Sequence, residues 1–198
     1  MVRTIAKDHD QKRDQILKSA AKVFAEKGFD RASMSMLARE CGISKANIYH
    51  YYDSKDALLF DILDTYLSEL RDQICGIPLD GLAPEDKLRA TISATLKAYQ
   101  GADNEHRVQT TGIPALPEAQ QEILRGYQRD MVGHMSALLS AVAPEVFEGD
   151  KGKLYAATMS VFGMLNWFYM WNSKAGAKAR EEYANLVTDL TLNGVRGI

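Results

Sequence analysis

The sequence has few cysteines, few prolines and no excess of basic residues. Its two cysteines, Cys41 and Cys75, are too few for a disulfide framework or for a zinc site made of cysteine alone. The 24 Lys and Arg residues face 26 Asp and Glu residues, so the net charge of −2 predicts no uniformly basic surface for nucleic acid. The first segment, MVRTIAKDHDQKRDQ, is charged where a signal peptide needs an apolar stretch. With 198 residues and 46% hydrophobic content, the chain is expected to be a folded cytoplasmic protein.

The sequence also lacks the short motifs of the common enzyme classes. It contains no HExxH, GxSxG, Walker or CxxC pattern. His106, His134 and Cys41 are the remaining candidates for chemistry. Cys41 ends a short predicted helix, where a small buried side chain is expected, and His134 lies among apolar residues, where a core or pocket residue is expected. We therefore expect no enzymatic activity, no cofactor and no metal.

One uncharged run of 19 residues, Tyr155 to Ser173, approaches the length that spans a bilayer. Thr158, Ser160 and Asn166 interrupt it, and no basic cluster flanks it. A helix buried on most sides within a bundle or an interface explains the run better, so no membrane contact is expected.

Hydrophobic residues recur at helical spacing along most of the chain. No segment alternates with period two over a strand length, and no repeat of roughly 20 to 50 residues is present. The sequence therefore predicts an all-α protein of about nine helices. These are expected over residues 10–27, 33–41, 44–52, 54–74, 84–100, 104–111, 117–143, 151–172 and 178–193.

The second and third predicted helices are short and joined by a tight turn that contains Gly42. Two such helices are the signature of a helix-turn-helix. Ser44 is a good N-cap, and the first turn after it carries Lys45, Ala46 and Asn47. Lysine can donate to guanine, asparagine can pair with adenine and the alanine methyl can touch a thymine methyl. This turn is therefore the candidate for reading base sequence.

Residues around this turn can hold phosphates. Tyr49, His50 and Tyr51 lie one turn further on, where hydroxyl and imidazole donors fix the register on DNA. Lys55 stands beside the predicted N-cap Ser54, and a cation at a helix N-terminus suits a phosphate. The alternative interpretation treats Tyr49 and Tyr52 as core aromatics of a small domain, and for Tyr52 it is the preferred one.

Charge is unevenly distributed along the chain. Residues 1–60 carry 11 basic and 8 acidic residues, a net of +3, whereas residues 61–198 carry 13 and 18, a net of −5. The basic surplus therefore coincides with the candidate DNA contacts. Arg3, Lys7, Lys12 and Arg13 either add phosphate contacts or form a charged tail.

The stretch AEKGFDRASMSMLARECGISKANIYHYYDSKDALL, residues 25–59, resembles the DNA-binding domain of the TetR family of transcriptional regulators. The likeness rests on a Gly-aromatic pair after the first helix, on Ala-Arg-Glu-x-Gly, on Ile-Ser-Lys-x-x-Ile-Tyr-x-Tyr-Tyr and on Ser-Lys-Asp-x-Leu. The later helices are similar to the family in number, order and length. The resemblance implies a three-helix DNA-binding domain over residues 1–54 and a helical ligand-binding and dimerisation domain over residues 55–198.

The resemblance also implies a role for each residue of the DNA-binding motif. Lys45, Ala46 and Asn47 match positions that face bases, and Ser35 matches one that reaches the groove edge. His50 falls at a variable position and is either a phosphate donor or a packing residue. The full set of candidate DNA contacts is Ser33, Met34, Ser35, Lys45, Ala46, Asn47, Tyr49, His50, Tyr51 and Lys55.

The later helices are rich in methionine and aromatic residues, which suit an adaptable apolar ligand, although core packing explains each of them as well. Arginines there can hold a carboxylate or the phosphates of a coenzyme A thioester, or lie on solvated faces. The segments 106–108 and 163–167 look like those of TetR-family members that control fatty-acid, phenylacetate or related acyl-CoA degradation. Candidate ligand contacts are Tyr99, His106, Arg107, Gln109, Arg125, Tyr127, Met131, Phe162, Asn166 and Trp167.

The predicted function is a ligand-responsive transcriptional repressor. Two short helices read too few base pairs for useful affinity, so a homodimer on a two-fold DNA operator is expected, released by a small apolar or acyl effector such as an acyl-CoA. The last two long helices are expected to form the dimer interface, with Ala179, Tyr183, Leu186, Val187, Leu190 and Gly194 as the stripe on the last one. The alternative is a helical protein-interaction module or small-molecule-binding protein without DNA binding.

Overall fold

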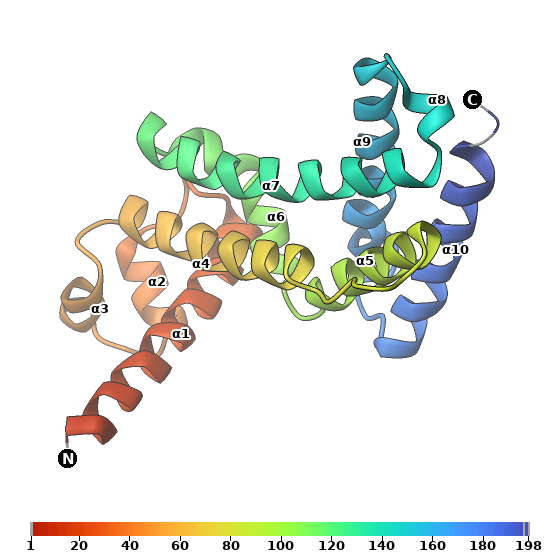
Figure 1. Ribbon diagram of the computed structural model, residues 1–198. Coiled ribbons are helices and arrows are strands. Elements are labelled where there is room, and N and C mark those ends of the chain that lie inside the picture. Colours follow the sequence, from red (N-terminus) through yellow and green to blue (C-terminus); the bar gives the residue numbers. More distant parts are fainter. Residues whose placement is uncertain (1, 196, 198) are drawn as a thin grey trace. The chain divides into compact units, whose positions relative to one another are not determined.

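The computed structural model describes residues 2–195 and 197, with side chains described from residue 11 onward apart from residues 196 and 198. Within that part of the chain every regular element is helical, which confirms the all-α prediction (Figure 1). The elements are α1 (Val2–Lys27), α2 (Met34–Glu40), α3 (Lys45–Tyr51), α4 (Lys55–Cys75), α5 (Pro84–Ala98), α6 (Asp103–Gly112), the 3-10 turn η1 (Ile113–Ala115), α7 (Glu118–Val142), α8 (Pro144–Phe147), α9 (Lys151–Trp171) and α10 (Ala177–Val195).

Each of the nine predicted helices is present, with bounds close to those expected. The four-residue helix α8 and the three-residue turn η1 were not predicted, because one turn of helix carries no periodic pattern. The helix α1 begins at Val2, not near Asp10, since Lys, Arg and Gln in the charged first segment are good helix formers. The side chains of Arg3 and Lys7, two of the predicted phosphate contacts, lie outside the described side chains.

The first of two compact units contains α1, α2, α3, the part of α4 up to Leu67, α6, η1 and the start of α7 up to Leu124. Gly28 ends α1 with a φ of +79°, and its N–H donates to the carbonyl of Phe24 at 2.9 Å. Phe29 then folds back onto Phe24, with 5.5 Å between the ring centroids, as expected for a glycine stop followed by an apolar residue. Further along, α6 lies close to α4, because a Cβ at Gly112 would come within 3.1 Å of a Leu59 methyl.

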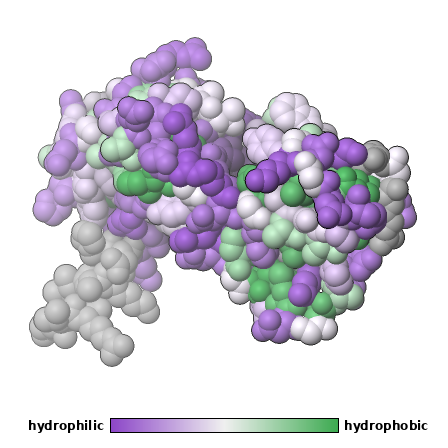
Figure 2. All heavy atoms as spheres, turned by 45° about the horizontal axis from the view of Figure 1, so that its top comes forward, coloured by the Kyte–Doolittle hydropathy of each residue, from purple (hydrophilic) through white to green (hydrophobic). Residues whose placement is uncertain are grey.

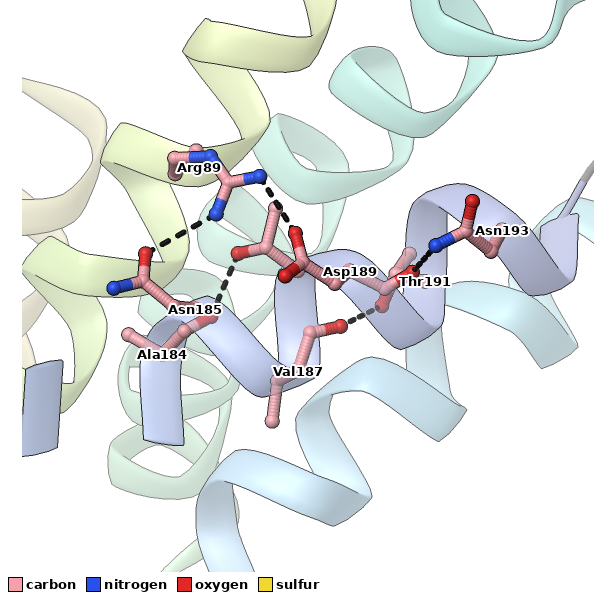
Figure 3. A network of polar contacts seen from close by, with 8 residues as sticks. Arg89, Ala184, Asn185, Val187, Asp189, Thr191 and Asn193 are labelled. Carbon is pink, nitrogen blue, oxygen red and sulfur yellow. Dashed lines mark hydrogen bonds and ion pairs between the residues drawn. The ribbon is translucent and has the colours of Figure 1, made fainter. Parts of the chain in front are cut away.

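The second unit contains the end of α4, α5, the rest of α7, and α8 to α10, and its main packing joins α5 to α10. Four buried threonines line these two helices, and each hydroxyl donates to the carbonyl four residues earlier, so none is left without a partner. At the edge of the same contact, Arg89 donates to Asn185 at 3.1 Å and to Asp189 at 2.7 Å (Figure 3). These threonines are Thr91, Thr95, Thr188 and Thr191.

No helix in the part of the chain that the structure describes is long and apolar enough to cross a membrane.

Candidate nucleic-acid interface

The motif of α2 and α3 is built by short-range contacts. The Ser33 hydroxyl accepts from the N–H of Met36 at 3.3 Å, and the Ser44 hydroxyl accepts from the N–H of Asn47 at 3.1 Å. Ser33 therefore caps α2, and Ser44 caps α3 as predicted. Gly42 adopts a φ of +66°, the left-handed conformation that lets the chain reverse direction within the short connection.

The first turn of α3 presents its side chains to solvent. Ile48 is the buried residue of α3 and fixes the helix to the core of the first unit. Lys45, Ala46 and Asn47 are all exposed, as residues that read base edges must be. The helix is therefore oriented so that its predicted reading turn faces away from the protein.

The predicted phosphate contacts on α3 are also accessible. Tyr49 and His50 are exposed, and Tyr51 is half-buried. The Lys45 ammonium lies 5.9 Å from the centre of the Tyr49 ring, and His50 meets Tyr51 edge to face. His50 does not belong to the core, so its imidazole is available at the surface beside the reading turn. Ser33 and Ser35 of the first helix are exposed as well.

The structure corrects the expectation for two candidates, Met34 and Lys55. Met34 is only 8% exposed and packs in the core, so its side chain faces the protein and not DNA. The Lys55 ammonium donates to the carbonyl of Phe29 at 2.9 Å and to those of Asp30 and Ala32 at 3.4 Å, above the Phe29 ring. Three carbonyls occupy its three donors, so Lys55 closes the connection between α1 and α2.

Arg13 is likewise engaged within the protein. Its guanidinium pairs with the carboxylate of Asp61 on α4, and the same carboxylate accepts a hydrogen bond from the Tyr52 hydroxyl at 2.5 Å. The guanidinium of Arg13 is thus engaged by a carboxylate 48 residues away in sequence, which neither of the two expectations for this residue included. The prediction that Tyr52 belongs to the core is confirmed, and burial together with the Asp61 carboxylate raises the pKa of the Tyr52 hydroxyl.

The ten predicted ligand contacts are divided between the two units. His106, Arg107 and Gln109 belong to the first unit, where Nδ1 of the buried His106 lies 3.1 Å from the Tyr66 hydroxyl and 3.3 Å from Nε2 of Gln109. Arg107 is exposed. Tyr66 on α4, which is not among the ten, is in direct contact with His106, although the two residues are 40 positions apart in sequence.

The other seven predicted ligand contacts belong to the second unit. Tyr99 donates to Oδ1 of Asn166 at 2.6 Å, and burial raises the pKa of the Tyr99 hydroxyl. Met131 and Phe162 are buried, Tyr127 stacks with the Arg71 guanidinium, and Arg125 is exposed. Trp167 is 61% exposed, which corrects the expectation that it lines an internal pocket.

His134 on α7, expected from its apolar neighbours to be a core or pocket residue, is a further polar residue of the second unit. Its Nε2 atom is buried without a hydrogen-bond partner, and burial lowers the pKa of its imidazole. A neutral imidazole with a buried ring nitrogen can accept from or donate to a bound molecule. The only sequence signal was its position among apolar residues on a long helix.

A helix expected to be buried on most sides, α9, is covered by its own chain on one face only. Val161, Phe162 and Phe168 are buried, whereas Trp167 and Trp171 lie on the surface. Figure 2 shows hydrophobic residues gathered on the surface of the unit that carries α9 and α10. We call the exposed large hydrophobic residues of these two helices the apolar face; they are Tyr155, Met159, Trp167, Met170 and Trp171 on α9 and Leu186 and Leu190 on α10.

The expected stripe on α10 is only partly exposed. Leu186 and Leu190 face solvent, while Val187 is fully buried within the chain and cannot contribute to an interface. The two helices meet in an aromatic cluster in which Tyr183 stacks on Phe168 at 4.5 Å and meets Trp171 edge to face at 5.1 Å. The apolar face therefore runs continuously from α9 onto α10.

A helix-turn-helix that precedes a larger helical unit defines the class of helix-turn-helix transcriptional regulators. Two family descriptions match the sequence: "Bacterial regulatory proteins, tetR family" over residues 16–62, and "Tetracyclin repressor-like, C-terminal domain" over residues 81–195. The second alone takes in more than half of the chain. The protein belongs to the tetR family of bacterial regulatory proteins, as its motif between residues 25 and 59 indicated.

Individual relatives agree with this assignment. A TetR-family transcriptional regulator from Bordetella parapertussis 12822 is 30% identical, and the match covers 94% of this chain and 96% of that one, with a TM-score of 0.85. AibR, solved with isovaleryl coenzyme A and operator DNA, shares the fold with a TM-score of 0.75 at 21% identity, over 90% of this chain and 97% of that one. The curated regulator YuxN of Bacillus subtilis (strain 168) is 27% identical over 75% of this chain, which spans only half of YuxN.

Proposed function

We propose that the protein is a ligand-responsive repressor that binds a two-fold DNA operator as a homodimer and releases it when a small apolar or acyl effector binds. The observation that carries this proposal is the exposed first turn of α3. Lys45, Ala46 and Asn47 are exposed there, while Ile48 behind them fixes the helix to the core. A protein-interaction module would have no reason to present a lysine and an asparagine at the start of a capped second helix.

Base and phosphate contacts are divided along α3. Lys45 and Asn47 stand where they can donate to or pair with bases in the major groove, and the Ala46 methyl can meet thymine. Tyr49, at the next turn, carries a hydroxyl donor suited to phosphate. The first group sets sequence preference, and the second sets affinity for any DNA.

The apolar face supports a homodimer. Trp167 and Trp171 on α9 and Leu190 on α10 are more than half exposed, and a stable soluble chain would not leave this much aromatic surface in water. The α9–α10 pairs of two copies can pack against each other across a two-fold axis. The same axis places a second α3 for the second half-site of the operator. We infer that α9 and α10 of a second copy cover this face.

Buried side chains of the second unit support an acyl effector. Met131 and Phe162 supply adaptable apolar surface, while Asn166 and the half-buried His134 supply polar groups. The exposed arginines follow at i, i+4 spacing on α7, as Arg125 and Arg129, and can meet coenzyme A phosphates. AibR, which was solved with isovaleryl coenzyme A, adds to this support through its shared fold.

Release follows from linkage. The repressor has one conformation that binds DNA and one in which α3 is misplaced. An effector that binds the second conformation more tightly weakens DNA binding, at most by the ratio of its two affinities. Helix α4 contributes residues to both compact units, and we infer that its displacement carries the signal. We place the boundary between DNA-binding domain and ligand-binding domain at residues 54 and 55, where α4 begins.

The test is a mobility-shift titration of the full chain on DNA from its own promoter region over a salt series. Specific binding should exceed binding to random DNA by about a thousandfold and weaken steeply with salt. Isovaleryl, hexanoyl and palmitoyl coenzyme A are then added, with coenzyme A and the free acids as controls. The DNA-binding proposal would be contradicted if the chain bound no DNA, or if its DNA binding did not weaken with salt. The acyl-CoA effector would be contradicted if the protein stayed bound to DNA in the presence of every thioester.

A further inference from the structure

The carboxylate of Asp61 on α4 joins three parts of the first unit. Its Oδ2 atom accepts from Nε of Arg13 on α1 at 3.1 Å and from the Tyr52 hydroxyl at 2.5 Å, while Oδ1 accepts from a terminal nitrogen of Arg13. The two-pronged arginine contact fixes the plane of the carboxylate, because a guanidinium and a carboxylate match only when coplanar. The carboxylate is therefore held in one orientation when it meets Tyr52.

Tyr52 is the residue at which α3 ends. Its N–H donates to the carbonyl of Ile48 at 2.9 Å, and its backbone then leaves the helix in an extended conformation. A helix of seven residues has little stability alone, so its direction depends on where it is attached. Its attachments to the rest of the first unit include Ile48, which is buried in the middle of the helix, and the Tyr52 side chain at the end.

The attachment at Tyr52 is specific in direction. The phenol ring is buried, and its hydroxyl reaches a charged acceptor, which makes a stronger and more directional bond than a neutral one. A single apolar anchor such as Ile48 fixes the position of a helix better than its direction. The bond from Tyr52 to Asp61 adds a directional link between the end of α3 and α4.

We propose that Asp61 is a positioning residue for DNA recognition: through Tyr52 it holds α3 at the angle at which Lys45 and Asn47 reach base edges, with Arg13 orienting the carboxylate. The inference rests on the proposed DNA-binding function. Because Asp61 stands on α4, a displacement of α4 moves the carboxylate that directs the end of α3.

The test uses the full chain and the variants Tyr52→Phe and Asp61→Asn. Tyr52→Phe keeps the ring and removes only the hydroxyl. The matched control is Glu40→Gln, which breaks the 2.7 Å ion pair of Lys22 and Glu40 between α1 and α2 and does not involve the end of α3. Dissociation constants for operator and random DNA are measured at one salt concentration, after stoichiometric titration has fixed the DNA-binding fraction of each preparation.

Both variants should bind the operator roughly tenfold more weakly, while binding to random DNA changes less than about twofold, because phosphate contacts tolerate a tilted helix. The double variant should be no weaker than either single one, since both break the same link. Glu40→Gln should match the wild type. A purely structural role would lower the melting temperature and the binding fraction while leaving the ratio of operator to random affinity unchanged, and that result overturns the inference.

The outcomes separate the two proposals. A wild-type chain that binds no DNA overturns the proposed function and this inference with it. A wild-type chain that discriminates its operator, together with a Tyr52→Phe chain that discriminates equally well, overturns only the positioning role of Asp61.

Discussion

The buried guanidinium of Arg180 donates to the carbonyl of Leu96 at 3.2 Å and so ties the last turn of α5 to the start of α10. The side chain is 2% exposed, and its Nε donates to the carbonyl of Ala175 at 3.2 Å, with the Phe168 ring 5.5 Å from the guanidinium. Arginine here acts as a cap for the C-terminal end of a helix, where carbonyls lack partners within the helix.

Replacement of Arg180 by Ala should therefore destabilise the second unit. The substitution removes the side-chain donors to the carbonyls of Leu96 and Ala175 and opens a cavity beside Phe168, so a loss of about 2–4 kcal/mol in the free energy of unfolding is expected from urea denaturation. Arg89→Ala is the matched control, since Arg89 bridges the same two helices at the surface. It should cost less than about 1 kcal/mol. Equal losses for the two variants would contradict the capping role of Arg180.

Substitutions on α3 should separate base reading from phosphate contact. Lys45→Ala is expected to weaken operator binding by about 1–3 kcal/mol and to relax sequence preference, whereas Tyr49→Phe should weaken binding to all DNA more evenly. Fluorescence anisotropy with operator and random duplexes distinguishes the two effects. The control is Lys97→Ala on α5, which removes an exposed lysine from the other unit. Unchanged operator affinity in both α3 variants would show that α3 is not the recognition helix.

A charge placed on the apolar face should break the proposed homodimer. Leu190 is exposed in the single chain, and Leu190→Asp would place a carboxylate where two copies meet. The dimer dissociation constant, measured by analytical ultracentrifugation, should rise at least about tenfold, and operator affinity should fall with it. Ile123→Asp on α7 alters an exposed hydrophobic residue outside the apolar face and should leave the dimer intact. A dimer that survives Leu190→Asp would place the interface elsewhere.

Both cysteines should react slowly with alkylating agents. Burial raises the pKa of the Cys41 and Cys75 thiols, so less thiolate is present at pH 7 than in a free cysteine. Iodoacetamide labelling followed by mass spectrometry should show both sites modified more slowly in the folded chain than in urea. Reaction should accelerate as pH rises above about 9, because the thiolate form then becomes populated. Equal rates in the folded and unfolded chain would contradict this expectation.

The local parts of the interface could be predicted from the sequence, because the signals lie within a few residues of one another. The caps Ser33 and Ser44 and the turn at Gly42 each act over three or four residues. The roles of Lys55 and Arg13 could not, since their partners lie 26 and 48 residues away. A cation near a DNA-binding motif looks the same in sequence whether it meets a phosphate or a carbonyl.

The candidate ligand contacts show the same limit. Tyr99 and Asn166, which are 67 residues apart, were both predicted and do form a hydrogen bond. Trp167, the next residue to Asn166, points to solvent instead of inward. The composition of α9 indicated that most of its surface is buried. Only the fold shows which face packs against the same chain and which face is the apolar face.

A homodimer formed through the apolar face would make the measured stability of the protein depend on its concentration. If Trp167 and Trp171 are buried only by a second copy of the chain, dimerisation stabilises the folded state, and folding is coupled to association. The melting temperature then rises with protein concentration, and comparisons between variants hold only at matched concentration. Dilution alone would thus act on this protein as a mild denaturant.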